Sequence, residues 1–190
     1  ATNPYAQNKI DIELMLKQIS ETVNDLSIKV LRYFNPIGSH SSLKIGENPK
    51  GIPNNLMPYI MGVAFGKYKF LKIFGSDFDT ADGTGVRDYI HIHDLAIAHQ
   101  AALNYEKEGI NYFNIGTGKG YSVLNLLNTF EEINKIKIPF KFVNRRKGDV
   151  ATVFADSKSA EEVLKWKAQK SLKDMCRDSF LFAKSQSELK

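Results

Sequence analysis

The sequence predicts an α/β protein in which a largely parallel sheet carries helices on its faces. Short runs rich in β-branched and aromatic residues alternate along the chain with longer stretches whose apolar residues recur at helical spacing. Strands that alternate with helices usually pair in parallel, because each helix returns the chain across the sheet. Hydrophobic residues make up 43% of the 190 residues and charged residues 25%, which indicates a sizeable core in one compact unit that can carry a lobe.

The N-terminal part of the chain should form a helix, a strand and a long loop. Asn3 followed by Pro4 resembles an N-cap with proline at the first helical position, and apolar residues then recur at helical spacing as far as Val23. Residues 27–34 (SIKVLRYF) are rich in β-branched and aromatic side chains, as a strand is. Residues 37–53 contain several glycines and prolines without periodicity, and so long a loop is uncommon unless it has a function.

The remainder of the chain continues the alternation of strands and helices. Turn residues separate the segments, and polar residues with capping side chains precede the helices. The expected elements are a helix from Asn55 to about Ala64, strands at 70–74 and 86–92, a helix at 95–105 capped by Asp94, a strand at 112–115, a helix from Ser122 to Asn134, a strand at 139–143, and helices at about 157–166 and 172–184.

Composition limits the cellular compartment and the classes of partner that we expect for the protein. The single cysteine, Cys176, cannot form an internal disulfide or a structural zinc site, so we expect a reducing compartment, namely the cytoplasm. The longest uncharged stretch, residues 51–66, is interrupted by prolines and is shorter than the about 20 apolar residues of a membrane span. The net charge of +5 is scattered, so we expect neither a nucleic-acid nor a membrane partner. The chain starts at Ala1 without a signal pattern, and we expect it to be part of a larger protein.

Tyr5 and Lys9 are four residues apart on the first predicted helix, so their side chains project from one face. An ammonium group close to a phenol favours the phenolate and lowers the pKa of the tyrosine from about 10, so that it can act as a general base and acid. The pattern Tyr-x-x-x-Lys alone is a weak signal. Before context is considered, two solvated surface residues are favoured by roughly ten to one.

The context of this pair changes that judgement, because five further motifs follow it in a characteristic order. They are LRYFNP in the first predicted strand, GIPNNLMPYI at 51–60, DGTGVRDYIHIHDLA at 82–96, YFNIGTGKGYSV at 112–123 and RRKGD at 145–149. In this order and spacing they resemble the C-terminal part of the UDP-glucose (UDP-galactose) 4-epimerase family, which belongs to the extended short-chain dehydrogenase/reductases. The resemblance covers essentially the whole chain, and its second and third motifs are the most specific.

The resemblance implies a fold and a division of labour. The chain would be the C-terminal part of a Rossmann-type, doubly wound parallel sheet, together with a smaller α/β substrate-binding lobe. Residues 1–36 would end the NAD-binding domain and residues 37–190 would form the lobe, with about 94–120 able to return to the Rossmann sheet. The sequence lacks the family's glycine-rich NAD-binding turn and the serine that partners the tyrosine. A missing N-terminal segment would therefore hold most of the NAD, and this segment would be inert alone.

The resemblance also implies catalytic and cofactor-binding roles. Tyr5 would take the proton from the sugar 4-hydroxyl while hydride leaves carbon 4 for NAD, and Lys9 would hydrogen-bond the nicotinamide ribose. Tyr33 falls where the family contacts the nicotinamide end of NAD, and Asn35 where it contacts the UDP-sugar. The 4-keto sugar would turn over in the pocket and take the hydride back on its opposite face. The expected enzyme is an NAD-dependent isomerase, and the family is usually dimeric.

The residues of the later motifs suit a diphosphate sugar on physical grounds as well. Arg87 and Arg146 can each offer a planar fork of donors to phosphate oxygens. Asn54, Asn55 and Leu56 lie at the start of a predicted helix, where free N–H groups and the positive end of the dipole favour an anion. An ordinary surface ion pair is the alternative for each arginine, and their motif context makes it the weaker one.

The remaining substrate positions come from the family resemblance. The family reads uracil partly through the backbone of the strand that contains Lys72, Ile73 and Phe74, and Phe74 can add an apolar wall. Further positions match the carboxylate that binds the uridine ribose, a residue beside the sugar phosphate, and a residue near the sugar 2-position; they are Asp149, Tyr89 and Val153. Some family members have tyrosine at the last position. We therefore hypothesise that the smaller valine leaves room for N-acetylated sugars.

Three features look functional but have simpler explanations. Gly116, Gly118 and Gly120 follow a strand, but their G-x-G-x-G spacing differs from a dinucleotide fingerprint, so we expect a tight turn. His91 and His93 would share a strand face, but no third ligand is evident, so we expect no metal site. The lysines near the C-terminus are expected to form a solvated helix face rather than a nucleic-acid patch.

Two other functions stay open. Another nucleotide-sugar enzyme of the same fold, a UDP-glucuronate decarboxylase or a nucleotide-sugar 4,6-dehydratase, would share most of these motifs. A non-catalytic nucleotide-sugar-binding module would keep Tyr5 and Lys9 only as ordinary helix residues. A stable 4-keto-6-deoxy product would identify a dehydratase, and activity that survives Tyr5→Phe would identify a bystander tyrosine.

Overall fold

Strand pairing, mostly parallel, organises the chain. The structure, a computed structural model, describes residues 4–188. Its strands are β1 (Ser27–Tyr33), β2 (Asn35–Ile37), β3 (Leu71–Phe74), β4 (Val86–Arg87), β5 (Tyr89–His91), β6 (Gly109–Ile115), β7 (Tyr121–Ser122), β8 (Phe140–Val143) and β9 (Thr152–Val153). The pairs β1–β6, β2–β5, β3–β8 and β4–β9 are parallel, and β4 also pairs with β7 in antiparallel. The predicted α/β class and the parallel pairing are confirmed.

Within the described residues, the strands form three two-stranded sheets and one three-stranded sheet. The division arises where the chain changes strand partner. The N–H of Phe34 donates to the carbonyl of Ile115 at 3.2 Å, whereas the N–H of Asn35 donates to the carbonyl of Asp88 at 3.1 Å. The backbone therefore stops pairing with β6 and starts pairing with β5 within one residue. The strand predicted at 86–92 is likewise split at Asp88.

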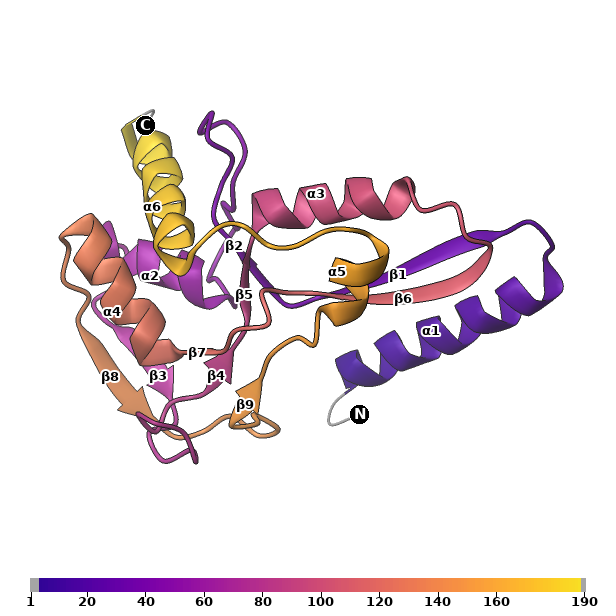
Figure 1. Cartoon of the computed structure of the whole chain (residues 1–190). Coiled ribbons are helices and arrows are strands. Elements are labelled where there is room, and N and C mark those ends of the chain that lie inside the picture. The colour runs from indigo at the N-terminus through magenta and orange to yellow at the C-terminus, as the bar shows by residue number, and fades with distance from the viewer. Residues whose placement is uncertain (1–3, 189–190) are drawn as a thin grey trace.

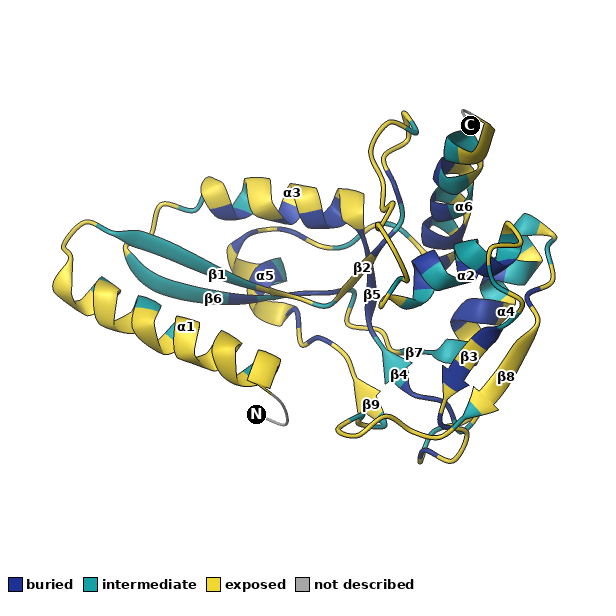
Figure 2. Ribbon diagram, turned by 180° about the vertical axis from the view of Figure 1, so that it is seen from behind, coloured by how far each residue is buried: buried dark blue, intermediate teal, exposed yellow. Residues whose placement is uncertain are grey.

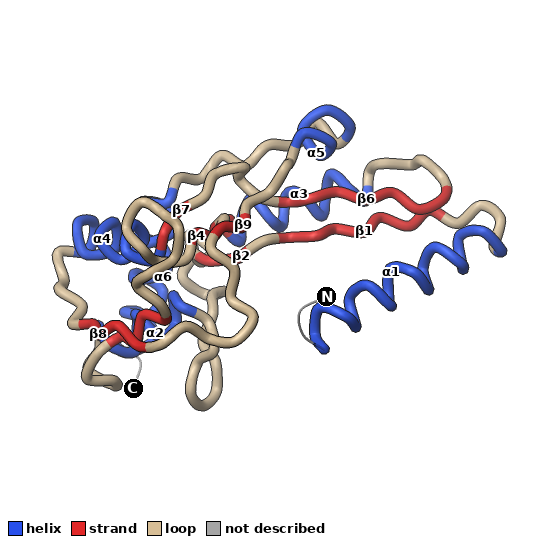
Figure 3. Tube along the Cα trace, turned by 90° about the horizontal axis from the view of Figure 1, so that it is seen from below, coloured by secondary structure: helices blue, strands red, loops and turns tan. Residues whose placement is uncertain are grey.

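The helices form two groups at opposite ends of the molecule. They are α1 (Pro4–Thr22), α2 (Leu56–Ala64), α3 (Ile92–Leu103), α4 (Val123–Asn134), α5 (Lys158–Val163) and α6 (Leu172–Glu188). α1, α3 and α5 contact the β1–β6 ribbon, whereas α2 and α4 pack against α6 (Figure 1). Seen from below, α1 runs alongside the ribbon and stands apart from the α2, α4 and α6 group (Figure 3). The predicted helices are confirmed, although α5 is shorter than expected.

Two hydrophobic cores correspond to these two groups. The first core lies between α2, α4, α6 and β3, and its fully buried members include Ile60, Phe130 and Met175. The second lies between α3, α5 and β6, and it includes Ala98 and Ile115. Adjacent residues of β5 contribute to different cores, because successive side chains of a strand point to opposite faces. β5 therefore connects the two halves of the fold.

The start of α3 differs from the expectation. Asp94 lies inside the first turn, and the cap is His91, whose Nδ1 accepts the N–H of His93 at 3.0 Å. The buried carboxylate of Asp94 instead accepts the N–H groups of Gln169 and Lys170, because the segment before α6 lies against it. His93 is therefore helical, and the expectation that it shares a strand face with His91 is wrong.

The other predicted caps have different outcomes. Ser122 caps α4 as expected, since its hydroxyl accepts the N–H of Asn125 at 2.9 Å. Asn55 occupies the N-cap position of α2, but its side chain makes no capping bond, and its amide donates to Glu47 Oε1 at 2.9 Å. The cap expected at Asn3 lies outside the described residues.

α1 differs from the other helices of the described residues in having no buried residue. Its apolar side chains Ile10, Leu14 and Met15 face solvent, and Figure 2 shows the helix exposed along almost all of its length. Arg32 on β1 binds Glu13 of the helix through both carboxylate oxygens, which ties α1 to the ribbon. Within the described residues, none of the helices combines the length and the apolar character that crossing a bilayer requires.

The capping role of His91 predicts a pH dependence of stability. Burial lowers the pKa of His91 from its ordinary 6.5, although Asp178, 3.2 Å from its Nε2, acts in the opposite direction. The folded state therefore holds His91 neutral at a pH where the unfolded state binds a proton. We expect the free energy of unfolding to fall as pH drops below about 6.5 toward the lower folded pKa, by up to about 1.4 kcal/mol per pH unit.

Urea unfolding of the protein and of His91→Asn between pH 5 and 8 measures this contribution. Asparagine keeps an acceptor for the His93 N–H but does not titrate, so the variant should lack this part of the pH dependence. Parallel stability curves for the two proteins would show that His91 does not couple folding to pH.

Candidate functional site

The structure brings Tyr5 and Lys9 together on α1, as the sequence predicts. The Lys9 Nζ lies 5.4 Å from the centroid of the Tyr5 ring, and 72% of Tyr5 is exposed. A cation over the face of a phenol is an attractive arrangement. Within residues 4–188, no hydrogen bond, ion pair or ring contact joins this pair to the expected substrate residues. The pair therefore forms one of several separate groups of candidate residues.

Tyr33 and Asn35 lie on either side of the point where the chain changes strand partner. The Tyr33 ring is 53% exposed and its centroid is 6.0 Å from that of His99 on α3. Asn35 is exposed and pairs in register with Tyr89 of β5. Tyr89 is only 3% exposed, and burial raises the pKa of its hydroxyl to about 12. Its ring belongs to the first core, so the hydroxyl stays protonated at neutral pH.

Phe74, Arg146 and Asp149 form a second group. Arg146 donates to both carboxylate oxygens of Asp149, at 2.9 and 3.2 Å, and its guanidinium carbon lies 5.0 Å from the centroid of the Phe74 ring. Arg146 is exposed, and Phe74 is partly open to solvent. A hollow of about 370 Å³ is lined by neighbouring residues 75–77 and 142–145. A cation, a carboxylate and an aromatic face thus meet beside an open space.

The strand that bears Phe74 also bears the other two residues expected to contact uracil. Lys72 is exposed and Ile73 is buried, as the alternation of a strand requires. The side chain of Ile73 fills the first core, so only its backbone faces the parallel partner β8.

Arg87 and Val153 are register partners in the parallel pair β4–β9. The Arg87 Nη1 donates to the carbonyl of Val86 at 2.7 Å, which turns the guanidinium back along its own strand. Asn55 and Leu56 lie at the N-terminus of α2, as expected, directly after Asn54. The side-chain amide of Asn55 donates a hydrogen bond to Glu47, which orients that side chain toward the 38–53 loop.

The residue that sequence reasoning missed is Asp88, between Arg87 and Tyr89. It is completely buried, and the N–H groups of Thr117 and Gly118 donate to its two carboxylate oxygens, each at 3.0 Å. The available signal was a carboxylate in a strand that is otherwise largely apolar, because such a group needs donors from elsewhere. The glycine-rich turn supplies them, so its N–H groups hold a side chain of the same chain, in agreement with the expected tight turn.

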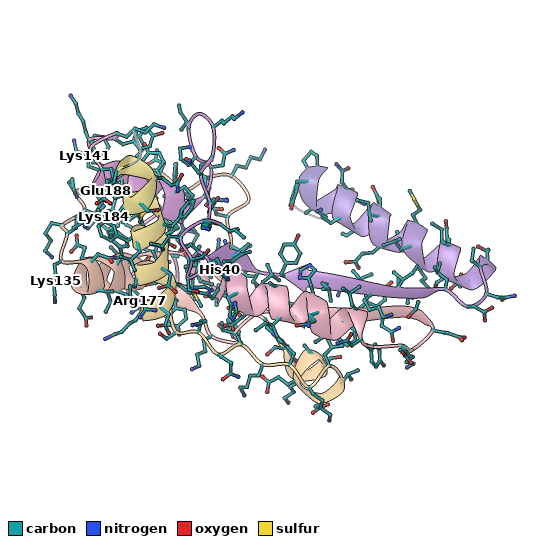
Figure 4. All side chains as sticks on the ribbon, turned by 90° about the horizontal axis from the view of Figure 1, so that it is seen from above. His40, Lys135, Lys141, Arg177, Lys184 and Glu188 are labelled. Carbon is teal, nitrogen blue, oxygen red and sulfur yellow. The ribbon has the colours of Figure 1, made fainter. Side chains whose placement is uncertain are left out.

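Several charged residues outside these groups form ion pairs. Lys137 binds Glu131 at 2.6 Å, and Lys173 binds Glu132 at 3.0 Å. Figure 4 shows the labelled Lys135, Lys141, Arg177, Lys184 and Glu188 side chains on the side of α4 and α6, away from α1. In the described part of the chain, no group of three or more His, Cys, Asp or Glu side chains is arranged to hold a metal ion.

Comparisons with known proteins place this geometry in a family. A family model described as GDP-mannose 4,6 dehydratase matches residues 1–179. The chain is 51% identical over 185 residues to the UDP-glucose 4-epimerase of Pasteurella multocida and 49% identical over 185 residues to that of Homo sapiens. These matches cover 96% of the chain but 55% and 53% of the two relatives. The chain thus spans about half the length of the curated relatives it matches.

Solved structures agree with the sequence matches. The UDP-glucose-4-epimerase from Stenotrophomonas maltophila, with bound NAD and formylated UDP-arabinopyranose, superposes with a TM-score of 0.96 at 46% identity, over 100% of this chain and 57% of that one. The enzyme from Bifidobacterium longum, in complex with NAD+ and UDP, gives 0.95 at 44% identity, over 98% and 56%. The chain therefore belongs to the extended short-chain dehydrogenase/reductases, in the family that the GDP-mannose 4,6 dehydratase model describes.

Proposed function

We propose that this chain is the substrate-binding part of an NAD-dependent enzyme that interconverts UDP-glucose and UDP-galactose. The observation that carries the proposal is the identity of about half of its residues, over nearly its whole length, to proteins named UDP-glucose 4-epimerase. The pairing of Tyr5 with Lys9 and the group formed by Phe74, Arg146 and Asp149 support it, because they offer an acid–base pair and a site for a nucleotide.

The exposed residues near the start of the chain fit the nicotinamide end of NAD. Tyr33 offers an open ring, and Lys9 offers an ammonium group to ribose hydroxyls. The sequence has no G-x-x-G-x-x-G turn for the pyrophosphate, so most of the cofactor requires a further segment. When bound, NAD supplies the acceptor and donor of a hydride at carbon 4 of the sugar.

In this proposal Tyr5 takes the proton of the sugar 4-hydroxyl and later returns it, and Lys9 stabilises the phenolate. Arg87 and Arg146 bind the diphosphate, together with the N–H groups at the start of α2 near Asn54, Asn55 and Leu56. The ribose hydroxyls donate to Asp149, which keeps acceptor capacity beside Arg146. Because the nucleotide is anchored, the 4-keto sugar can turn over without leaving.

The remaining expected residues complete the pocket. Uracil contacts the backbone of Lys72 and Ile73 and the ring of Phe74, while Asn35 and the Tyr89 segment border the sugar. Residues 1–36 belong with the NAD-binding domain and residues 37–190 with the substrate lobe. The return of residues 94–120 to the first domain is supported by the parallel pairing of β6 with β1.

We also propose that the enzyme is a cytoplasmic homodimer whose subunits contain the NAD-binding segment that precedes this sequence. The exposed apolar side chains of α1, including Ile10, Leu14 and Met15, support contacts with both, because apolar groups at such density gain free energy when covered.

A second candidate reaction, nucleotide-sugar 4,6-dehydration, is favoured by the description of the matching family model. The relatives of about 50% identity carry the epimerase name, and this favours the first candidate. The products distinguish the two reactions: UDP-glucose and UDP-galactose reach equilibrium under an epimerase, whereas a dehydratase accumulates a 4-keto-6-deoxy sugar.

The acid–base role of Tyr5 is tested by Tyr5→Phe in the complete enzyme, meaning this chain with its NAD-binding segment. Removal of the hydroxyl should lower kcat about 10²–10⁴-fold, the usual contribution of a general acid–base group. Affinity for UDP should stay within about twofold, because the nucleotide site lies on other elements. Coupled assay of UDP-glucose formation and calorimetry with UDP measure the two quantities.

Tyr105→Phe is the matched control, because Tyr105 packs against Phe113 away from every candidate residue and should keep wild-type turnover. Full activity of Tyr5→Phe would refute the assignment of Tyr5 and favour a non-catalytic binding module.

The size of residue 153 predicts sugar specificity. Val153 is partly exposed beside Arg87, and its side chain is much smaller than that of a tyrosine. The complete enzyme should convert UDP-N-acetylglucosamine, and Val153→Tyr should lower kcat/KM for that sugar at least about tenfold while conversion of UDP-glucose stays within about threefold. If the valine enzyme turned over the N-acetylated sugar no better than its tyrosine variant, the hypothesis would be wrong.

A further inference from the structure

The carboxylate of Asp88 is the most fully hydrogen-bonded buried polar group near the proposed substrate residues. Its Oδ1 accepts the N–H and the hydroxyl of Thr117, at 3.0 and 2.6 Å. Its Oδ2 accepts the N–H groups of Gly118 and Ala155, at 3.0 and 3.2 Å. The ion pairs found within residues 4–188 do not include Asp88, so hydrogen bonds alone compensate the carboxylate. Four converging donors require a group that only accepts, as an ionised carboxylate does.

The backbone of Asp88 adds two further connections. Its N–H donates to the carbonyl of Val153, and its carbonyl accepts the N–H of Asn35, both at 3.1 Å. Together with the bond from Ala155 to the carboxylate, this attaches residue 88 both to β9 and to the segment that follows it. The preceding residue is Arg87. One buried position thus contacts the strands that carry three of the proposed substrate residues.

The glycine-rich turn is shaped to close on this carboxylate. A Cβ atom on Gly116 would lie 2.6 Å from the Asp88 Oδ2 and 2.5 Å from the Cβ of Ala155, which is closer than atoms can approach. Gly118 has a φ of 71°, a conformation that favours glycine. The turn therefore packs against a side chain from β4–β5 at the distance where its N–H groups can donate.

We propose that Asp88 is a positioning residue, which sets the relative places of Asn35, Arg87 and Val153 and thereby the geometry in which the UDP-sugar is held. The inference rests on the proposed function, since those three residues are assigned to the substrate there. Asp88 itself does not touch the substrate. Its effect should therefore be on nucleotide-sugar binding rather than on the proton transfer at Tyr5.

The test is Asp88→Asn in the complete enzyme. The amide keeps the shape of the side chain, but its NH₂ group replaces one of the accepting oxygens. That NH₂ group then faces an N–H donor of the turn or of Ala155, and because two donors repel each other, at least one of these segments must move away from residue 88. We expect the Kd for UDP and the KM for the UDP-hexose to rise about tenfold or more. The kcat and its pH profile should stay within about threefold, because Tyr5 and Lys9 lie on another element.

Asp94→Asn is the matched control. Asp94 is also buried and also accepts two backbone N–H groups, from Gln169 and Lys170, but it contacts none of the proposed substrate residues. Its variant should lose thermal stability with UDP affinity unchanged. If Asp88→Asn behaved like Asp94→Asn, with a lower Tm and unaltered Kd and KM, Asp88 would be only structural and the proposal would be overturned.

If Asp88→Asn does not fold, Thr117→Val tests the positioning role of Asp88 instead. It removes one hydroxyl donor to Asp88 and should raise the KM about two- to threefold with kcat unchanged, whereas an unchanged KM would overturn the proposal. The UDP titrations also separate this inference from the proposed function. An unmodified enzyme that binds UDP without interconverting the two sugars would refute the proposed reaction, while the UDP affinities of the variants would still decide the role of Asp88.

Discussion

At Phe34 and Asn35 the backbone gives its hydrogen bonds to two different strands, and the layout of the molecule follows from that exchange. Before it, β1 runs beside β6 and is covered by α3; after it, β2 runs beside β5, which leads into α3 and contributes to both cores. Since each residue of a strand can serve only one neighbour on a given side, the exchange forces the sheet to divide. Two cores then form, one on each side of the division.

This division places the candidate residues for proton transfer in one half of the fold and the candidate residues for nucleotide binding in the other. The proposed acid–base pair, Tyr5 and Lys9, lies on α1 beside the ribbon of long strands, where the helix holds the two side chains one turn apart. The groups suited to a nucleotide lie around β3, β4 and the loop that precedes β9, in the half built on the other core. A reaction in which the sugar must turn while its nucleotide stays fixed benefits from such separation.

Local signals were sufficient for most of the elements, and long-range contacts decided the rest. Helical spacing placed Tyr5 beside Lys9, and the hydroxyl of Ser122 began α4 as its residue type predicts. Asp94 looked like a cap, but donors about 75 residues further along the chain take its carboxylate, and no local pattern contains that information. Asp88 escaped notice for the same reason, because its donors come from two distant segments whose approach only the folded chain reveals.

One outer edge of β1 is without a strand partner among residues 4–188, and the apolar side chains of α1 lie beside it in water. Unpaired peptide groups next to oily side chains act as a template on which other extended chains can add. A polypeptide of these residues alone would therefore tend to associate with other chains in concentrated solution. Any segment that covered this edge and these side chains would remove that tendency.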